Sequence, residues 1–104
     1  MPKRASIVWT RPALNSLLKI TRYIQSDKPA AARHFADAIK AKVARLERFP
    51  DSGRIVHEFP ASGLREVLVG DYRVIYRVRP TSPSVQILAV RHGAQLLEML
   101  PGLR

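Results

Sequence analysis

The chain has 104 residues, of which 46% are hydrophobic, and this is enough for one domain with one modest core. The absence of cysteine excludes disulfides, thiolate catalysis and cysteine zinc sites. Eighteen Lys and Arg residues face eight Asp and Glu residues, and the net charge of +10 favours an acidic partner, either nucleic acid or an acidic protein surface. The alternative is a soluble protein whose basic surface has no partner.

Other classes of protein are also disfavoured. The sequence has no apolar run long enough for a membrane span and no signal-peptide pattern near Met1. His34, His57 and His92 are not spaced like metal ligands. We therefore expect a cytoplasmic protein with no membrane segment, no metal and no cofactor.

The N-terminal half predicts one strand and two helices. Residues 6–10 are rich in β-branched and aromatic side chains, which favours a strand. Thr10 is a suitable N-cap before Pro12, so a helix over about 11–26 follows, and residues 27–29 repeat this start signal. The second helix, over 30–49, has basic outer faces and ends before a proline. Its apolar stripe consists of Phe35, Ile39, Val43, Leu46 and Phe49.

The C-terminal half predicts three strands. Residues 64–69 and 72–79 are β-rich runs separated by Gly70-Asp71, and glycine first in a two-residue loop indicates a type II′ hairpin. A turn at 80–84 leads to a third run over 85–90, and residues 95–100 are a candidate short helix. The expected fold is α+β in the order β-α-α-β-β-β, with two N-terminal helices packed on one face of a small antiparallel sheet. The other face is expected to be partly open.

The two-residue loop predicts which hairpin side chains face the helices. Val69 lies opposite Tyr72 and Arg65 opposite Tyr76, on an apolar sheet face. Arg65 is near the strand end, where it can stack on Tyr76 or extend past the sheet edge.

The opposite sheet face carries several arginines. Arg73, Arg77 and Arg79 alternate along one strand, and Glu66 lies diagonally beside the first two. One interpretation is a solvent-exposed charge pair worth under about 1 kcal/mol. The other is a cationic patch extended by Arg91.

Five parts of the sequence, in this order and spacing, resemble the toxins of the RelE/ParE superfamily, the toxin halves of type II toxin–antitoxin modules. They are Ile7-Val-Trp-Thr-Arg-Pro-Ala13, Leu46-Glu-Arg-Phe-Pro50, Gly53-Arg54 with Leu64-Arg-Glu66, Gly70-Asp-Tyr-Arg-Val-Ile-Tyr76, and Ile87-Leu-Ala-Val-Arg-His-Gly93. The details are closer to the ParE branch, the plasmid-stabilisation proteins, than to the ribonucleolytic RelE branch. The resemblance implies one toxin domain over residues 1–104, an often acidic antitoxin that wraps it in a hetero-oligomer, and growth arrest. ParE-like members poison DNA gyrase, whereas RelE-like members cleave mRNA in the ribosomal A site.

The residues favour a binder over a ribonuclease. Metal-free RNA cleavage needs a base, an acid and cations for the phosphate charge, and His92 is the only well-placed titrating candidate. Leu68 and Val69 stand where some relatives place a catalytic arginine, and residues 94–100 contain no tyrosine and no further arginine. If the chain were a ribonuclease, the candidate catalytic residues would be Arg65, Arg73, Arg77 and His92.

The leading hypothesis is therefore a non-enzymatic inhibitor of DNA gyrase, and the alternative is a RelE-like, ribosome-dependent mRNA endonuclease. Sequence-specific DNA binding is weaker, because no helix-turn-helix or ribbon signature is apparent. The apolar tail of Leu96, Leu97, Met99 and Leu100 is expected to pack on the domain or on the antitoxin. The expected target contacts are Arg65, Arg73, Arg77, Arg79 and Arg91.

Overall fold

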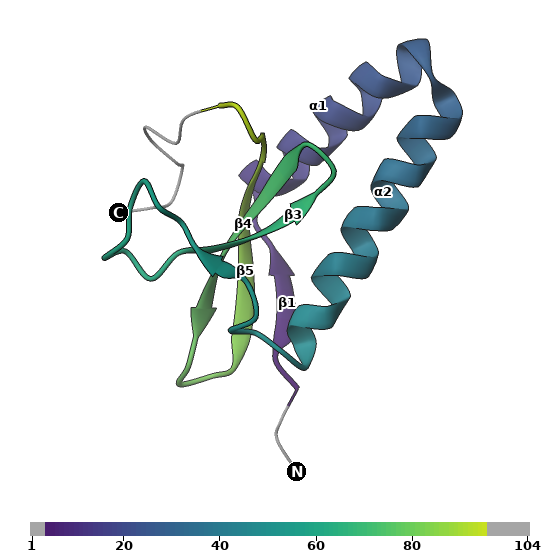
Figure 1. Ribbon diagram of the computed structural model, residues 1–104. Coiled ribbons are helices and arrows are strands. Elements are labelled where there is room, and N and C mark those ends of the chain that lie inside the picture. Colours follow the sequence, from purple (N-terminus) through teal and green to yellow (C-terminus); the bar gives the residue numbers. More distant parts are fainter. Residues whose placement is uncertain (1–3, 96–104) are drawn as a thin grey trace.

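A helical hairpin lies on one face of a five-stranded sheet in the computed structural model, which describes residues 4–95 (Figure 1). This arrangement confirms the predicted α+β fold. The elements in chain order are β1 (Ser6–Trp9), α1 (Arg11–Asp27), α2 (Pro29–Ala44), the short 3-10 helix η1 (Arg45–Glu47), β2 (Arg54–Ile55), β3 (Arg65–Val69), β4 (Tyr72–Arg79) and β5 (Ser84–His92). The helix predicted over 95–100 and the apolar tail fall beyond the described residues.

The start of α1 is fixed by Thr10, as predicted. Its hydroxyl oxygen accepts a hydrogen bond from the backbone N–H of Ala13 at 3.4 Å, which satisfies one of the free donors of the first turn. The same hydroxyl donates to the carbonyl of Ile87 at 2.7 Å. Thr10 therefore both begins the helix and ties it to β5.

The second helix differs from the prediction at both ends. Pro29 keeps the preceding residue out of the helical region, so the N-cap is Lys28, whose ammonium group has no acceptor and makes no side-chain cap bond. At the other end the chain tightens into η1, whose three residues per turn rotate the following side chains. Phe49 is consequently 57% exposed and does not belong to the apolar stripe, whereas Ile39, Val43 and Leu46 are buried as predicted.

The sheet is mixed. Its strand order is β1-β5-β4-β3-β2, and β1 pairs with β5 in parallel while the other neighbours are antiparallel. The prediction of an antiparallel sheet is therefore wrong for β1. After the helical hairpin the chain returns to the far edge of the sheet, and the last strand fills the place beside the first.

The predicted register of the β3–β4 hairpin is confirmed. Val69 pairs with Tyr72, and Arg65 pairs with Tyr76. Gly70 has a φ of 57°, and no non-glycine residue in the described range has positive φ, which fits a type II′ rather than a type I′ turn. The register shift of the sheet lies between β4 and β5, where Leu88 is the extra residue, so it leaves this hairpin unchanged.

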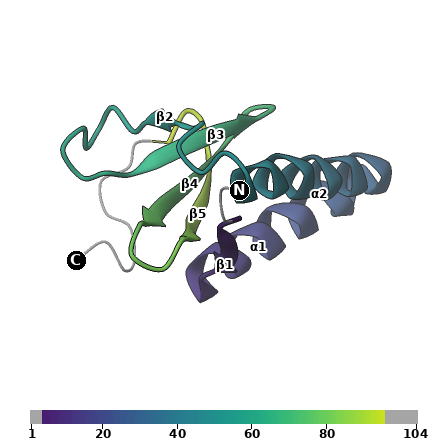
Figure 2. The ribbon, with the colours of Figure 1, turned by 90° about the horizontal axis from the view of Figure 1, so that it is seen from below.

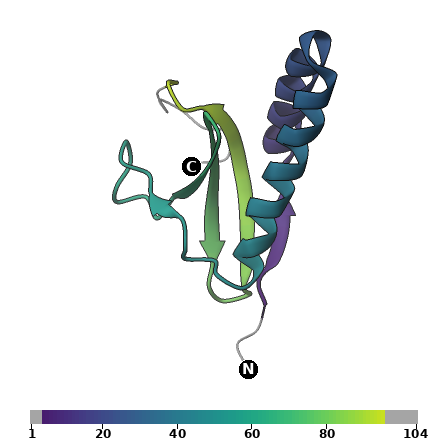
Figure 3. The ribbon, with the colours of Figure 1, turned by 45° about the vertical axis from the view of Figure 1, so that its right-hand side comes forward.

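Both faces of the sheet are covered. The helices cover one face, and the segment between β2 and β3 lies over part of the other, as the views in Figures 2 and 3 show. In this segment Val56, Phe59 and Leu64 pack with Ile75, Leu88 and Ala89 in a second, smaller apolar cluster.

The expectation of an open arginine face is therefore wrong at its centre. Arg73 and Ile75 are buried there. The expectation of an open face holds only toward the C-terminal end of β4, where Arg77 is half-buried and Arg79 is exposed.

No helix within residues 4–95 combines the length and apolar character that crossing a bilayer requires.

Candidate functional site

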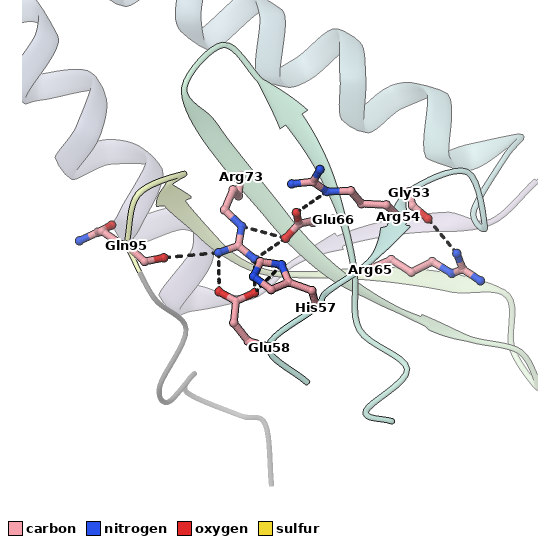
Figure 4. A network of polar contacts seen from close by, with 8 residues as sticks. All are labelled: Gly53, Arg54, His57, Glu58, Arg65, Glu66, Arg73 and Gln95. Atoms are coloured by element: carbon pink, nitrogen blue, oxygen red, sulfur yellow. Dashed lines mark hydrogen bonds and ion pairs between the residues drawn. The ribbon is translucent and has the colours of Figure 1, made fainter. Parts of the chain in front are cut away.

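A buried guanidinium lies at the centre of the sheet face opposite the helices. The side chain of Arg73 on β4 is 3% exposed. Its two terminal nitrogens each donate to one carboxylate oxygen of Glu58 at 2.7 Å, and its Nε donates to Oε1 of Glu66 at 2.8 Å (Figure 4). The hydrogen bonds to Glu58 and then those to Glu66 raise the pKa of Arg73 against the opposing effect of burial. Arg73 is therefore a permanently charged and fully engaged group.

Arg54 completes this group, which we call the Arg73 cluster: Arg54, Glu58, Glu66 and Arg73. Glu66 is buried on β3, and its Oε2 accepts a hydrogen bond from Nε of Arg54 at 2.6 Å. Two arginines and two glutamates sum to zero formal charge, which compensates the cost of burying Glu66 and Arg73. His57 lies at the rim, with its Nδ1 3.3 Å from Oε1 of Glu58.

The Arg73 cluster joins the segment between β2 and β3 to the sheet. Glu58 comes from that segment, whereas Glu66 and Arg73 come from two neighbouring strands. The sequence predicted the Glu66–Arg73 neighbourhood from the hairpin register, and the structure confirms it. The sequence missed Glu58 and His57, because an irregular segment has no periodicity from which its direction can be read. It missed Arg54 because β2 is only two residues long.

Arg65 is held at the end of β3 by the backbone. Its Nη1 donates to the carbonyl of Gly53 at 2.7 Å, and its Nε lies 3.8 Å from Oδ1 of Asp51 (Figure 4). Its side chain is half-buried. Arg65 therefore extends from the start of β3 toward the segment that precedes β2.

The hydroxyl of Tyr76 makes two hydrogen bonds with the segment that precedes β2. It donates to the carbonyl of Pro50 and accepts from the N–H of Gly53, both at 2.8 Å. A Cβ on Gly53 would lie 2.8 Å from the carbonyl oxygen of Glu66 and would also collide with the Tyr76 hydroxyl, so only glycine fits there. Burial raises the pKa of Tyr76, so the hydroxyl keeps its proton and serves structure rather than acid catalysis.

The remaining predicted arginines do not form one patch. Arg77 and Arg79 lie toward the end of β4, opposite Gln86 and Ser84, whereas Arg91 lies opposite Arg73 at the other end of the β4–β5 pair. Arg79 lies six positions along β4 from Arg73, and this corresponds to a distance of about 20 Å. The structure therefore divides the expected target surface into two parts.

His92 is exposed at the end of β5. Its Nδ1 accepts a hydrogen bond from the N–H of Ala94 at 3.1 Å, and its ring meets Tyr72 edge-on at 5.3 Å. It borders a shallow depression of about 300 Å³, whose other lining residues are Arg54, His57, Leu68, Gly70, Asp71, Arg73, Gly93 and Ala94. Within residues 4–95, no three His, Asp or Glu side chains gather in a way that would hold a metal.

A second depression, of about 260 Å³, separates α1 from the ends of β4 and β5. We call it the α1 groove; its lining residues are Ser16, Lys19, Ile20, Tyr23, Tyr72, Val90, Arg91 and Gln95. β1 pairs with β5 only as far as Ile87, so the groove lies where β5 continues without that neighbour. Its lining combines apolar side chains with two cations.

The sequence profile of ParE toxins from type II toxin–antitoxin systems (parDE) matches residues 7–97, nearly the whole chain. The chain belongs to the ParE toxin family. The resemblance read from the sequence is thereby confirmed.

Solved structures of the RelE/ParE superfamily share the fold of this ParE toxin. A chain of the chromosomal ParDE system from P. aeruginosa has a TM-score of 0.70 at 22% identity, covering 86% of this chain and 96% of that one. A chain of the toxin–antitoxin complex RelBE2 from Mycobacterium tuberculosis has a TM-score of 0.62 at 24% identity, covering 86% and 98%. A mutant of E. coli RelE in the free state has a TM-score of 0.60 at 16% identity, covering 88% and 85%. None of the curated proteins matches the sequence.

Proposed function

We propose that this ParE toxin arrests growth in the cytoplasm by binding DNA gyrase, without cleaving RNA, and that a cognate antitoxin neutralises it. The observation that carries the proposal is the engagement of Arg73. This arginine is the central cation of the sheet face; Glu58 and Glu66 accept four of its five N–H donors, and the carbonyl of Gln95 accepts the fifth at 3.4 Å. A cation committed in this way has no donor left for a phosphate in the transition state.

Two further side chains that can carry a proton are engaged by the backbone. The hydroxyl of Tyr76 has two backbone partners, and the Nδ1 of His92 accepts a backbone N–H. His57 lines the same depression as His92, but its Nδ1 lies 3.3 Å from a carboxylate oxygen of Glu58. General acid–base cleavage needs both groups within reach of one phosphodiester.

Inhibition by binding needs only a charged and shaped surface. Arg77 and Arg79 supply the first part of the proposed gyrase surface, and Arg91 supplies the second. Arg65 adds the partly exposed edge of its guanidinium. Arg73, although predicted as a contact, is left out because it is buried.

The proposed antitoxin site is the α1 groove. Ile20, Tyr72 and Val90 offer apolar area, while Lys19 and Arg91 favour an acidic segment. The P. aeruginosa structure is of a chromosomal ParDE toxin–antitoxin system, and the M. tuberculosis structure is of a toxin–antitoxin complex. A hetero-oligomer with an acidic antitoxin segment in this groove accords with the net charge of +10.

Paired assays separate gyrase from the ribosome as the target. Purified toxin is added to a gyrase supercoiling reaction and to a translation reaction that reports cleavage of ribosome-bound mRNA. We expect loss of supercoiling or trapped gyrase–DNA cleavage complexes, with mRNA intact. Cleaved mRNA together with unaffected supercoiling at saturating toxin would establish the ribonuclease instead.

The antitoxin site is tested by co-expression with the neighbouring open reading frame and size-exclusion chromatography. We expect one stable complex, weakened by Tyr23→Glu, because this tyrosine is 78% exposed and borders the groove. The matched control is Ala38→Glu, an exposed position on α2 that introduces the same charge. Equal complex stability in both variants would exclude the α1 groove as the site.

A further inference from the structure

The positive charge of the protein is concentrated on the helical hairpin. Residues 11–48 contain nine Lys and Arg residues against three Asp and Glu residues, a net charge of +6. All ion pairs found within residues 4–95 lie between positions 51 and 73, so none involves a cation of the hairpin. The arginines at the centre of the sheet are neutralised internally, whereas those of the hairpin are not.

The two helices of the hairpin differ in what else they expose. Large hydrophobic side chains are exposed on α1 at Leu14, Leu18 and Tyr23, whereas α2 and η1 expose none, and the next is Phe49, beyond η1. The outer side of α2 instead alternates cations with small residues. The basic surface, which we call the α2 basic face, consists of Arg33, Lys40, Lys42, Arg45 and Arg48, all of them exposed.

This difference distinguishes two kinds of partner. The centre of a protein–protein interface is depleted in charged residues and enriched in aromatic and other large apolar side chains. The exposed part of α1 fits that description, and α2 does not. A surface of cations separated by alanines fits the phosphate backbone of a nucleic acid, which needs charge and close approach but no apolar pocket.

The shape of α2 is compatible with a duplex. Ile39, Val43 and Leu46 are buried toward the sheet, which leaves the outer side of the helix free along its length (Figures 1 and 3). Sixteen residues of helix span about 24 Å, roughly the length of seven base pairs. Arg33, Lys40 and Lys42 lie on α2, with the exposed Asp37 between the first two, and Arg45 and Arg48 extend the surface through η1. The cations are therefore spread along the helix, so they can follow a backbone rather than meet one phosphate.

We propose that the α2 basic face binds the phosphate backbone of duplex DNA without reading its sequence. The choice of DNA over other nucleic acids rests on the proposed function, because gyrase holds duplex DNA. In such a complex α2 would contact DNA next to the enzyme, while α1 and the end of β4 remain available to proteins. Phosphate contacts would then add affinity for gyrase that is engaged with DNA over free gyrase.

The test measures DNA binding without gyrase. Fluorescence anisotropy of a labelled duplex is followed with the full-length toxin over a range of salt concentrations. The variant Lys40→Gln/Arg45→Gln/Arg48→Gln removes three charges from the α2 basic face. The matched control, Arg11→Gln/Lys19→Gln/Arg22→Gln, removes three exposed charges from α1. Glutamine preserves helix propensity, and circular dichroism and thermal melting confirm that both variants are folded.

We expect wild-type toxin to bind duplexes of unrelated sequence equally, with an affinity that falls steeply as salt rises. The α2 variant should lose at least tenfold in affinity at low salt, and its log–log salt slope should decrease by about 2 to 3, since each phosphate contact contributes about 0.9. The α1 variant should keep most of the wild-type slope.

Three results would overturn the inference: no salt-dependent binding by wild type, an equal loss in both variants, or tighter binding to RNA duplexes or single strands than to DNA. Supercoiling assays on the same proteins keep this question apart from the proposed function. DNA binding through α2 without gyrase inhibition would refute only the gyrase target. Gyrase inhibition with unchanged DNA affinity of the α2 variant would refute only the DNA contact.

Discussion

Arg73 and Glu58 form two parallel hydrogen bonds of 2.7 Å each, joining β4 to a segment that has no regular secondary structure. Bidentate arginine–carboxylate pairs are among the stronger polar contacts in proteins. Here the pair holds the segment that carries part of the second apolar cluster, and Arg73 is buried. In this chain Arg73 therefore serves structure.

Replacement of Arg73 by alanine should destabilise the fold by about 3 to 5 kcal/mol, because it leaves Glu66 and Glu58 without their main cationic partner in a buried site. Urea denaturation followed by circular dichroism measures the change. Arg79→Ala, at an exposed strand end, is the control and should stay within about 0.5 kcal/mol of wild type. If both variants unfold at the same urea concentration, the Arg73 cluster does not hold the segment.

Removal of the Tyr76 hydroxyl tests the anchor of a different segment, the turn that precedes β2. Tyr76→Phe leaves the N–H of Gly53 without its partner and should cost about 1 to 3 kcal/mol. Tyr23→Phe, at an exposed position, should be neutral in the same denaturation experiment. An equal, small effect of both substitutions would mean that water replaces the hydroxyl.

The alkaline stability of the protein should depend on Tyr76. Burial raises its folded-state pKa above the ordinary value of 10.0, so the folded state retains the proton more tightly than the unfolded chain. The resulting stability is fully present below pH 10 and is lost as pH rises through the folded-state pKa. Denaturation midpoints from about pH 9 to about pH 11 should therefore fall more steeply for wild type than for Tyr76→Phe. Parallel curves would contradict a buried, protonated phenol.

Most of the fold could be predicted because its signals are local. Thr10, the Gly70-Asp71 loop and the helical apolar stripe each act within a few residues; the first two are confirmed, and the stripe is confirmed except for Phe49. The parallel placement of β1 could not be predicted, since it depends on where the chain re-enters the sheet after the 44 residues between β1 and β2. Phe49 is exposed because the chain changes from an α-helix to a 3-10 helix before it, and the composition of the sequence does not indicate that change.

At the candidate site, only the neighbours across β3 and β4 could be predicted, because they follow from the hairpin register. That register placed Glu66 beside Arg73 and Arg65 opposite Tyr76, as observed. It gave no information about the segment over 56–64, whose apolar residues cover the sheet and whose Glu58 completes the ion pairs. The open arginine face was wrong because a sheet face was treated as solvent when an irregular segment had its own apolar residues to bury.

The division of the arginines into buried and exposed groups predicts separable effects on toxicity. Arg77→Gln/Arg79→Gln removes two charges from the end of β4, where neither side chain is fully buried. If these residues contact gyrase, the concentration needed to inhibit supercoiling should rise about tenfold or more, since 1.4 kcal/mol of interface energy corresponds to a factor of ten. The melting temperature should stay unchanged.

Two comparisons make this prediction specific. Arg11→Gln/Arg22→Gln removes the same charge from exposed positions of α1 and should leave gyrase inhibition near wild type. Arg91→Gln reports on the other end of the β4–β5 pair, about 20 Å away. If all three variants lose activity equally, the net charge of the toxin, rather than a located surface, governs inhibition. If only Arg91→Gln loses activity, the gyrase surface adjoins the α1 groove, and antitoxin and gyrase would compete for overlapping residues.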